Sequence, residues 1–160
     1  MYIPTGIVEP MTVLDSMPTF VDRTAGFVYR HSYSLLRIAL GAVFIWFGAL
    51  KVADATPVAA LVEGTTPWTD PSWFVPALGA FEVALGLWFV VGRGLLLAVP
   101  VLVAHLIGTF GVLVLTPQVA FQDGNPLLLT TEGEFVAKNV VLITAALVVG
   151  ARSYRSRLTR

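Results

Sequence analysis

The segment WFVPALGAFEVALGLWFVVG, residues 73–92, contains Glu82 as its only ionisable residue. A helix needs about 20 apolar residues, at roughly 1.5 Å each, to cross the hydrocarbon core of a bilayer. Glu82 is the tenth residue of the segment, so a spanning helix would place its carboxyl group near the midplane. An unpaired carboxylate there costs several kcal/mol, and we therefore expect Glu82 to be paired, hydrated or protonated.

The composition of the whole chain is that of a membrane protein. Hydrophobic residues make up 56% of the 160 residues and charged residues 12%, whereas a soluble domain is about 25% charged. The absence of cysteine from the sequence excludes disulfides, thiolate metal sites and a cysteine nucleophile. The net charge of zero gives no long-range attraction to nucleic acid, so we expect no nucleic-acid partner.

Three further segments are long and apolar enough, or nearly so, to span a bilayer. They are residues 33–52, residues 95–116 and the shorter residues 135–151. Only Arg93 and Gly94 separate the second span from the third, which predicts a tight antiparallel hairpin. The predicted fold is therefore an all-α membrane protein, a bundle of four transmembrane helices.

The spans divide the chain into three parts. We expect a cytoplasmic N-terminal lead-in over residues 1–32, containing a short amphipathic helix near residues 20–29. The four-helix transmembrane bundle then occupies residues 33–151, and a basic cytoplasmic tail follows over residues 152–160.

The arginines predict the orientation of the bundle. All eight fall on one side of a chain with four spans: Arg23, Arg30, Arg37, Arg93, Arg152, Arg155, Arg157 and Arg160. Because basic residues accumulate on the cytoplasmic side, we expect both termini to be cytoplasmic in a multi-pass membrane protein. The connections on the other side, residues 53–72 and 117–134, are expected to be irregular. They either cap the bundle, meet a partner or serve as ordinary loops.

Glycines that share a helix face indicate where the helices pack, because small residues let helices approach closely in lipid. Gly41 and Gly48 lie on one face of the first span, and two glycines flank Glu82 on the second. With a pair from the third span, the predicted packing residues are Gly41, Gly48, Gly79, Gly86, Gly108 and Gly111.

Six polar residues are candidates for a buried cluster. Glu82 and His105 each lie about halfway along a span, on helices joined by the hairpin, so we expect a contact between them. The partner of Glu82 stays open among a larger set of groups. The candidates are Glu82, His105, Lys51, Lys138, Asn139 and Arg37. The cluster either fixes the register of the helices or lines a polar pocket or proton path.

Four motifs carry a resemblance to a known family. In chain order they are LLRIALGAVFIWFGALK, GAFEVALGL, LVLTP and GEFVAKNVVLITAALVV. Together they resemble the DoxX-like superfamily of small four-helix membrane proteins, in the branch that contains the bacterial reactive-chlorine-resistance inner-membrane protein. The resemblance implies a four-helix bundle and places family-pattern positions at Arg37, Lys51, Glu82, Lys138 and Asn139.

The resemblance carries no catalytic residue with it. His105 lies outside the family pattern, so a role for it rests on its depth in the bilayer alone. The founding member of the superfamily, which this chain resembles, is the small subunit of a thiosulfate:quinone oxidoreductase. Other members are associated with resistance to oxidative stress.

Three functions are compatible with these features. The first is an accessory subunit that stabilises a larger respiratory or transporter assembly through other membrane-protein subunits. The second is a quinone-linked redox subunit in which Glu82 and His105 handle the quinone oxygen and a proton. The third is a small proton-coupled permease. We expect no metal site, because the two histidines lie far apart in sequence, and no cofactor other than a quinone. We also expect no stand-alone enzyme, because no serine stands beside a plausible base and no glycine-rich phosphate loop follows a strand.

Overall fold

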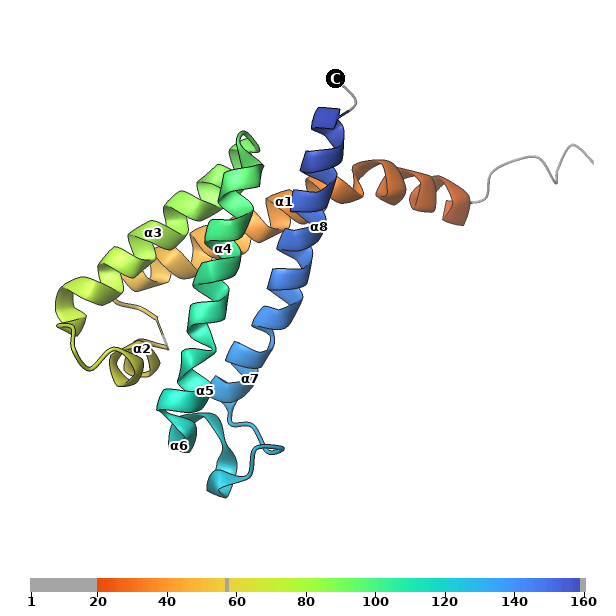
Figure 1. The fold of residues 1–160 in the computed structure, drawn as a ribbon. Helices are drawn as coiled ribbons and strands as arrows, with labels where there is room; N and C mark the ends of the chain where they lie inside the picture. The colour runs from red at the N-terminus through yellow and green to blue at the C-terminus, as the bar shows by residue number, and fades with distance from the viewer. Residues whose placement is uncertain (1–19, 57, 159–160) are drawn as a thin grey trace, which may run out of the picture. The chain divides into compact units, whose positions relative to one another are not determined.

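The computed structural model describes residues 20–56 and 58–158, and Figure 1 shows its helices. The chain divides into two units, Met1–Ser32 and Tyr33–Arg160. Most of the predicted lead-in, residues 1–19, lies outside the described residues. In the first unit, the described residues are the start of a helix.

The first helix, α1, is longer than the sequence predicts and runs over Phe20–Val52. We expected a short helix near residues 20–29 and a separate span from residue 33, but the two form one helix. This segment contains no proline, and Asp22 in its first turn is favourable near the positive end of the helix dipole.

The second span is the helix α3, Pro71–Val91, and its ends follow from its sequence. Asp70 caps the N-terminus by accepting a hydrogen bond from the backbone N–H of Ser72 at 2.9 Å. Hydrogen bonds from the side chain of Ser72 and from its backbone N–H lower the pKa of the Asp70 carboxyl below its usual value. Gly92 ends the helix at φ 74°, a left-handed conformation that glycine adopts without strain.

Each of the last two spans consists of two helical segments. The third joins α4, Leu95–Thr109, to α5, Gly111–Leu115. The fourth joins α7, Thr131–Ala137, to α8, Asn139–Leu158. The helical stretch of the fourth span is longer than the predicted apolar segment, residues 135–151, because the helix continues into the arginine-rich segment at its C-terminal end.

Four helical stretches of the described residues are long and apolar enough to cross a membrane. They are Phe20–Val52, Pro71–Val91, Leu95–Leu115 and Thr131–Leu158. Large apolar side chains are exposed on these helices, among them Trp46, Leu97, Ile107, Val141 and Leu147. An apolar surface of this kind is suited to lipid and unsuited to water. The predicted all-α fold with four spans is confirmed, and the protein is a multi-pass membrane protein.

Helices α1 and α3 approach closely at two pairs of glycines. A Cβ on Gly41 would lie 2.6 Å from the carbonyl oxygen of Gly86, and one on Gly86 would lie 2.5 Å from that of Gly41. Gly48 and Gly79 are related in the same way, at 2.5 and 2.6 Å. These four predicted packing glycines therefore lie where two backbones meet.

The other two predicted packing glycines do not lie at a helix contact. A Cβ on Gly108 would meet no atom within 4 Å, and one on Gly111 would meet only the side chain of Leu115, at 3.7 Å. The expectation for this pair was wrong. Helix α4 instead packs along α8 through larger side chains, and Leu102, Ala146 and Val149 are buried there.

The connections between the spans cover one end of the bundle. They contain the short helices α2, Ala59–Thr65, and α6, Pro117–Ala120, and a 3₁₀ turn, η2, over Gln122–Gly124. They are more regular than the sequence predicts. Leu61, Val112, Ala120 and Val136 form a small core that joins α2 and α6 to α5 and α7. This core closes the end of the bundle opposite the α3–α4 hairpin (Figure 1).

Candidate functional site

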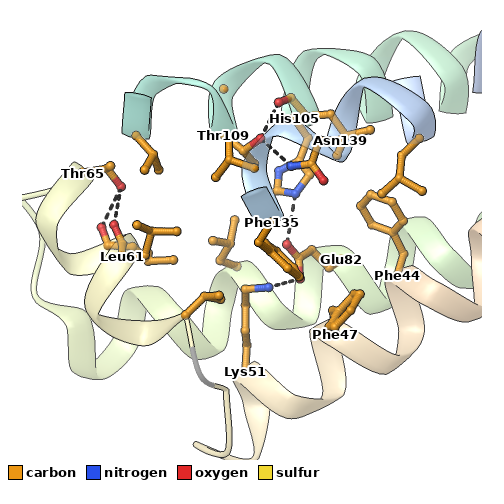
Figure 2. Close-up of a pocket in the computed structure, with 18 of the residues that line it drawn as sticks. Phe44, Phe47, Lys51, Leu61, Thr65, Glu82, His105, Thr109, Phe135 and Asn139 are labelled. Carbon is orange, nitrogen blue, oxygen red and sulfur yellow. Dashed lines mark hydrogen bonds and ion pairs between the residues drawn. The ribbon is translucent and has the colours of Figure 1, made fainter. Parts of the chain in front are cut away.

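Glu82 lies buried between two partners that come from different helices (Figure 2). Its Oε2 accepts a hydrogen bond from Nζ of Lys51 on α1 at 2.6 Å. Its Oε1 lies 3.1 Å from Nε2 of His105 on α4. The side chains of Lys51, Glu82 and His105 are only 7%, 8% and 12% exposed, so water outside the bundle screens this cluster little.

The glycine contact between α1 and α3 positions the ion pair. Lys51 follows Gly48 by three residues and Glu82 follows Gly79 by three, so each charged group lies one turn beyond its glycine. A Cβ on Gly79 would lie 2.6 Å from Cβ of Lys51. The missing side chain of Gly79 therefore leaves room for the stem of the lysine.

The chemistry of the three groups fixes the direction of their hydrogen bonds. With Glu82 ionised and paired with Lys51, its Oε1 can only accept, and the hydrogen bond is then donated by Nε2–H of His105. The lysine ammonium balances the carboxylate charge. A buried ion pair persists when its members are also hydrogen-bonded, and here the imidazole supplies the second bond to the acid.

Two phenylalanines contact the imidazole. The ring of Phe44 on α1 meets His105 edge-on, with centroids 6.0 Å apart. The ring of Phe81 on α3 does the same at 5.5 Å. These contacts orient His105 toward Glu82 and keep the cluster in apolar surroundings.

A second polar group lies one helical turn from His105. Thr109 is four residues further along α4, and its Oγ1 accepts a hydrogen bond from Nδ2 of Asn139 on α8 at 2.8 Å. Oγ1 in turn donates to the carbonyl oxygen of Leu106 at 2.6 Å. Asn139 is buried. Thr109 was not among the residues predicted for the cluster, although its spacing from His105 puts both on one face of the helix.

Both polar groups line one cavity of about 690 Å³ (Figure 2). Its polar lining includes Lys51, Glu82, His105, Thr109 and Asn139. The rest of the wall is mainly aliphatic and aromatic. The small core at the end of the bundle contributes to it through Leu61, Val112 and Val136. The volume lies within the range of about 300–1,000 Å³ that is usual for small-molecule sites.

Parts of the cavity wall are exposed at the surface of the bundle. Gly108 on α4 lines it and is exposed, with open space where a Cβ would lie. Val141 on α8 also lines it and is 68% exposed. Phe47 and Phe135 also line the cavity, and their rings meet edge to face with centroids 5.5 Å apart. At these exposed parts of the wall the acyl chains of a bilayer would surround the protein.

Two predicted members of the cluster lie elsewhere. Lys138 is at the rim of the cavity, but its side chain is 73% exposed and its Nζ pairs with Oε2 of Glu134 at 3.1 Å. Its ammonium does not reach Glu82, because it pairs instead with Glu134, which lies one helical turn away and is also exposed. Arg37 donates from Nη1 to the carbonyl oxygens of Phe89 and Val90, at 2.9 Å each, and so holds the last turn of α3.

No group of three or more His, Cys, Asp or Glu residues suited to a metal ion occurs in the described part of the chain. The polar cluster contains one carboxylate and one imidazole, and its third member is a lysine. Its chemistry is that of hydrogen bonding and proton transfer.

The chain was compared with protein-family models, curated proteins and solved structures. The model of a family described as DoxX matches residues 32–116, just over half of the chain. This range includes Lys51, Glu82 and His105 but ends before Asn139. Searches of curated proteins and of solved structures found no match to the chain.

Proposed function

The chain belongs to the DoxX family, and we propose that it binds a quinone in the cavity as the small membrane subunit of a larger redox assembly. The observation that carries the proposal is the buried cluster of Lys51, Glu82 and His105 in the wall of an apolar cavity of about 690 Å³. A quinone has an apolar ring whose polar atoms are carbonyl oxygens. The cavity offers the matching surfaces.

Lys51 supplies the hydrogen bond that a carbonyl oxygen needs. An ammonium group has three hydrogens, and the bond to Glu82 uses one of them. The remaining hydrogens are available to a ligand in the cavity, where a charge-assisted bond is stronger than in water. The lysine thus holds the ligand oxygen beside the carboxylate.

Glu82 and His105 provide a route for protons. The reduction of a quinone to a quinol takes up two electrons and two protons, and the reverse reaction releases them. The hydrogen-bonded pair can pass a proton between its members and a ligand oxygen within reach. The electrons are exchanged with an electron-carrying partner subunit, which is the reason for proposing an assembly.

The flanks of the cavity suit a ligand that arrives through the bilayer. Quinones dissolve in the hydrocarbon core, and Gly108 and Val141 place exposed parts of the cavity wall at the lipid-facing surface. We also propose that the protein lies in a bacterial inner membrane. Its arginine-rich end, where Arg93 links α3 to α4, would face the cytoplasm.

Quinone binding is tested on the purified protein in lipid nanodiscs by equilibrium dialysis of a radiolabelled short-chain quinone. We expect saturable binding to the native protein and binding weakened about tenfold or more by Glu82→Gln. Glu134→Gln is the matched control, because it makes the same change in the exposed pair with Lys138. The absence of saturable binding, or equal affinity of the Glu82 variant and the native protein, would contradict the proposal.

The assembly is tested separately by purification from native membranes in mild detergent. We expect a partner in fixed stoichiometry that carries a redox group. Recovery of the chain alone, with native activity of its membranes unaffected by its deletion, would rule out the assembly and leave the quinone site as a separate question.

A further inference from the structure

Thr109 fixes the orientation of the Asn139 side chain. A threonine hydroxyl has a single hydrogen, and Thr109 donates it to the carbonyl oxygen of Leu106 at 2.6 Å. Toward Asn139, at 2.8 Å, the hydroxyl can therefore only accept. The amide must present Nδ2 to Thr109, and the hydrogen-bond network thereby distinguishes its nitrogen from its oxygen.

This orientation leaves the amide oxygen of Asn139 without a partner among the described residues. Asn139 is only 7% exposed and lines the cavity. A buried acceptor without a partner is unfavourable, so a ligand that donates a hydrogen bond to it binds more tightly. Oδ1 of Asn139 is thus an acceptor in the cavity wall with no partner among the described residues, and it adds to the hydrogens of Lys51 that Glu82 does not use.

The two polar groups of the cavity are arranged to bind both ends of one ligand. His105 and Thr109 are four residues apart on α4 and so lie on one face, one turn from each other. The group around Glu82 and Lys51 can donate to a ligand oxygen. The group at Asn139 accepts.

We infer that Asn139 recognises a hydroxyl group of the ligand and that the cavity therefore binds the quinol more tightly than the quinone. This inference rests on the proposed function. A quinone presents only acceptors, whereas a quinol presents hydroxyl donors. One quinol hydroxyl donates to Oδ1 of Asn139, and the other oxygen accepts from Nζ of Lys51 beside Glu82.

The inference is tested by measuring the affinities of one quinone and its own quinol, under anaerobic conditions, for the protein in nanodiscs. We expect the native protein to bind the quinol about tenfold more tightly, the ratio that one hydrogen bond of about 1.4 kcal/mol produces. For a two-electron couple, this ratio raises the midpoint potential of the bound quinone by about 30 mV.

Thr109→Val is the informative variant. It preserves the shape of the side chain but removes the hydroxyl that fixes the amide, so Asn139 can turn its nitrogen toward a carbonyl and the affinity ratio should fall toward one. Thr144→Val is the matched control, because that hydroxyl bonds only to the carbonyl of Val140 and lies outside the cavity lining. Its ratio should equal that of the native protein.

The outcomes separate the two proposals. If neither form binds, the proposed function fails and the inference fails with it. If both forms bind the native protein equally well, or if Thr109→Val keeps the native ratio, quinone binding stands and the role of Asn139 is overturned.

Discussion

At the scale of single residues, the structure answers why a membrane-spanning helix carries an acid. Glu82 is satisfied on both oxygens, by the ammonium of Lys51 and the imidazole of His105. Removing one member of a buried ion pair leaves the other charge uncompensated, which costs more than the pair itself contributes. The three residues therefore act as a unit.

We predict that Lys51→Met lowers the free energy of unfolding by about 3–5 kcal/mol, because it leaves the Glu82 carboxylate buried without its cation. Adding Glu82→Gln should recover most of this loss, since the amide oxygen still accepts from His105. The measurement is the thermal unfolding midpoint in detergent. The exposed pair provides the control, and Lys138→Met should cost about 0.5 kcal/mol. A double variant no more stable than Lys51→Met would contradict the account.

The sequence predicted part of this site. Counting residues along the hairpin placed Glu82 and His105 at the same depth, and their side chains meet in the structure. Depth alone did not distinguish Lys51 from Lys138, because the choice depends on the direction in which each side chain leaves its helix. The lack of a side chain at Gly79 favours Lys51, and that relation appears only once the two helices are packed.

At the scale of helices, the contact between α1 and α3 supports the site. Its two pairs of glycines bring the backbones close enough for Lys51 to reach Glu82. The sequence indicated these glycines by their shared faces, but the same pattern gave a false signal at Gly108 and Gly111. A small residue permits a close contact without requiring one, and Gly108 borders the cavity instead.

We predict that Gly48→Ala destabilises the protein by about 1–3 kcal/mol, because its methyl group would lie 2.5 Å from the carbonyl oxygen of Gly79. Gly108→Ala adds the same methyl group in open space and should be neutral or slightly stabilising. The thermal unfolding midpoints of the two variants give the comparison. Equal losses of stability would show that the α1–α3 contact is not as close as described.

The helix ends were less predictable than the spans. Hydropathy identifies the part of a helix that lies in lipid, but α1 and α8 continue beyond it as polar helices. The short helices α2 and α6 carry weak sequence signals. They are stabilised by the small core with α5 and α7, whose residues come from distant parts of the chain.

At the scale of the whole molecule, the cavity could not be predicted from the sequence. Its wall combines residues of α1, α2, α3, α4, α5, α7 and α8. The hydrophobic pattern of a single helix does not indicate how far that helix lies from its neighbours at one end of the bundle. The number of spans, in contrast, follows from composition and length alone.

The orientation of the bundle remains a prediction, and the lack of cysteine in the sequence makes it simple to measure. Leu127 and Leu158 are both exposed; Leu127 lies in the connection just before the last span, and Leu158 lies at the end of that span. We expect Leu127→Cys to react with a membrane-impermeant maleimide in intact cells and Leu158→Cys to react only after permeabilisation. The reverse pattern would place both termini outside and contradict the positive-inside assignment.

The most direct test of the central claim is photo-crosslinking of the protein in nanodiscs with a photoreactive quinone, followed by mapping of the modified peptides. The account predicts labelling of the cavity wall around His105 and Thr109 on α4 and Asn139 on α8, and loss of this labelling in the presence of excess unlabelled quinone. Labelling confined to lipid-facing residues such as Leu97 and Leu147, and insensitive to competitor, would show that the cavity is not a quinone site.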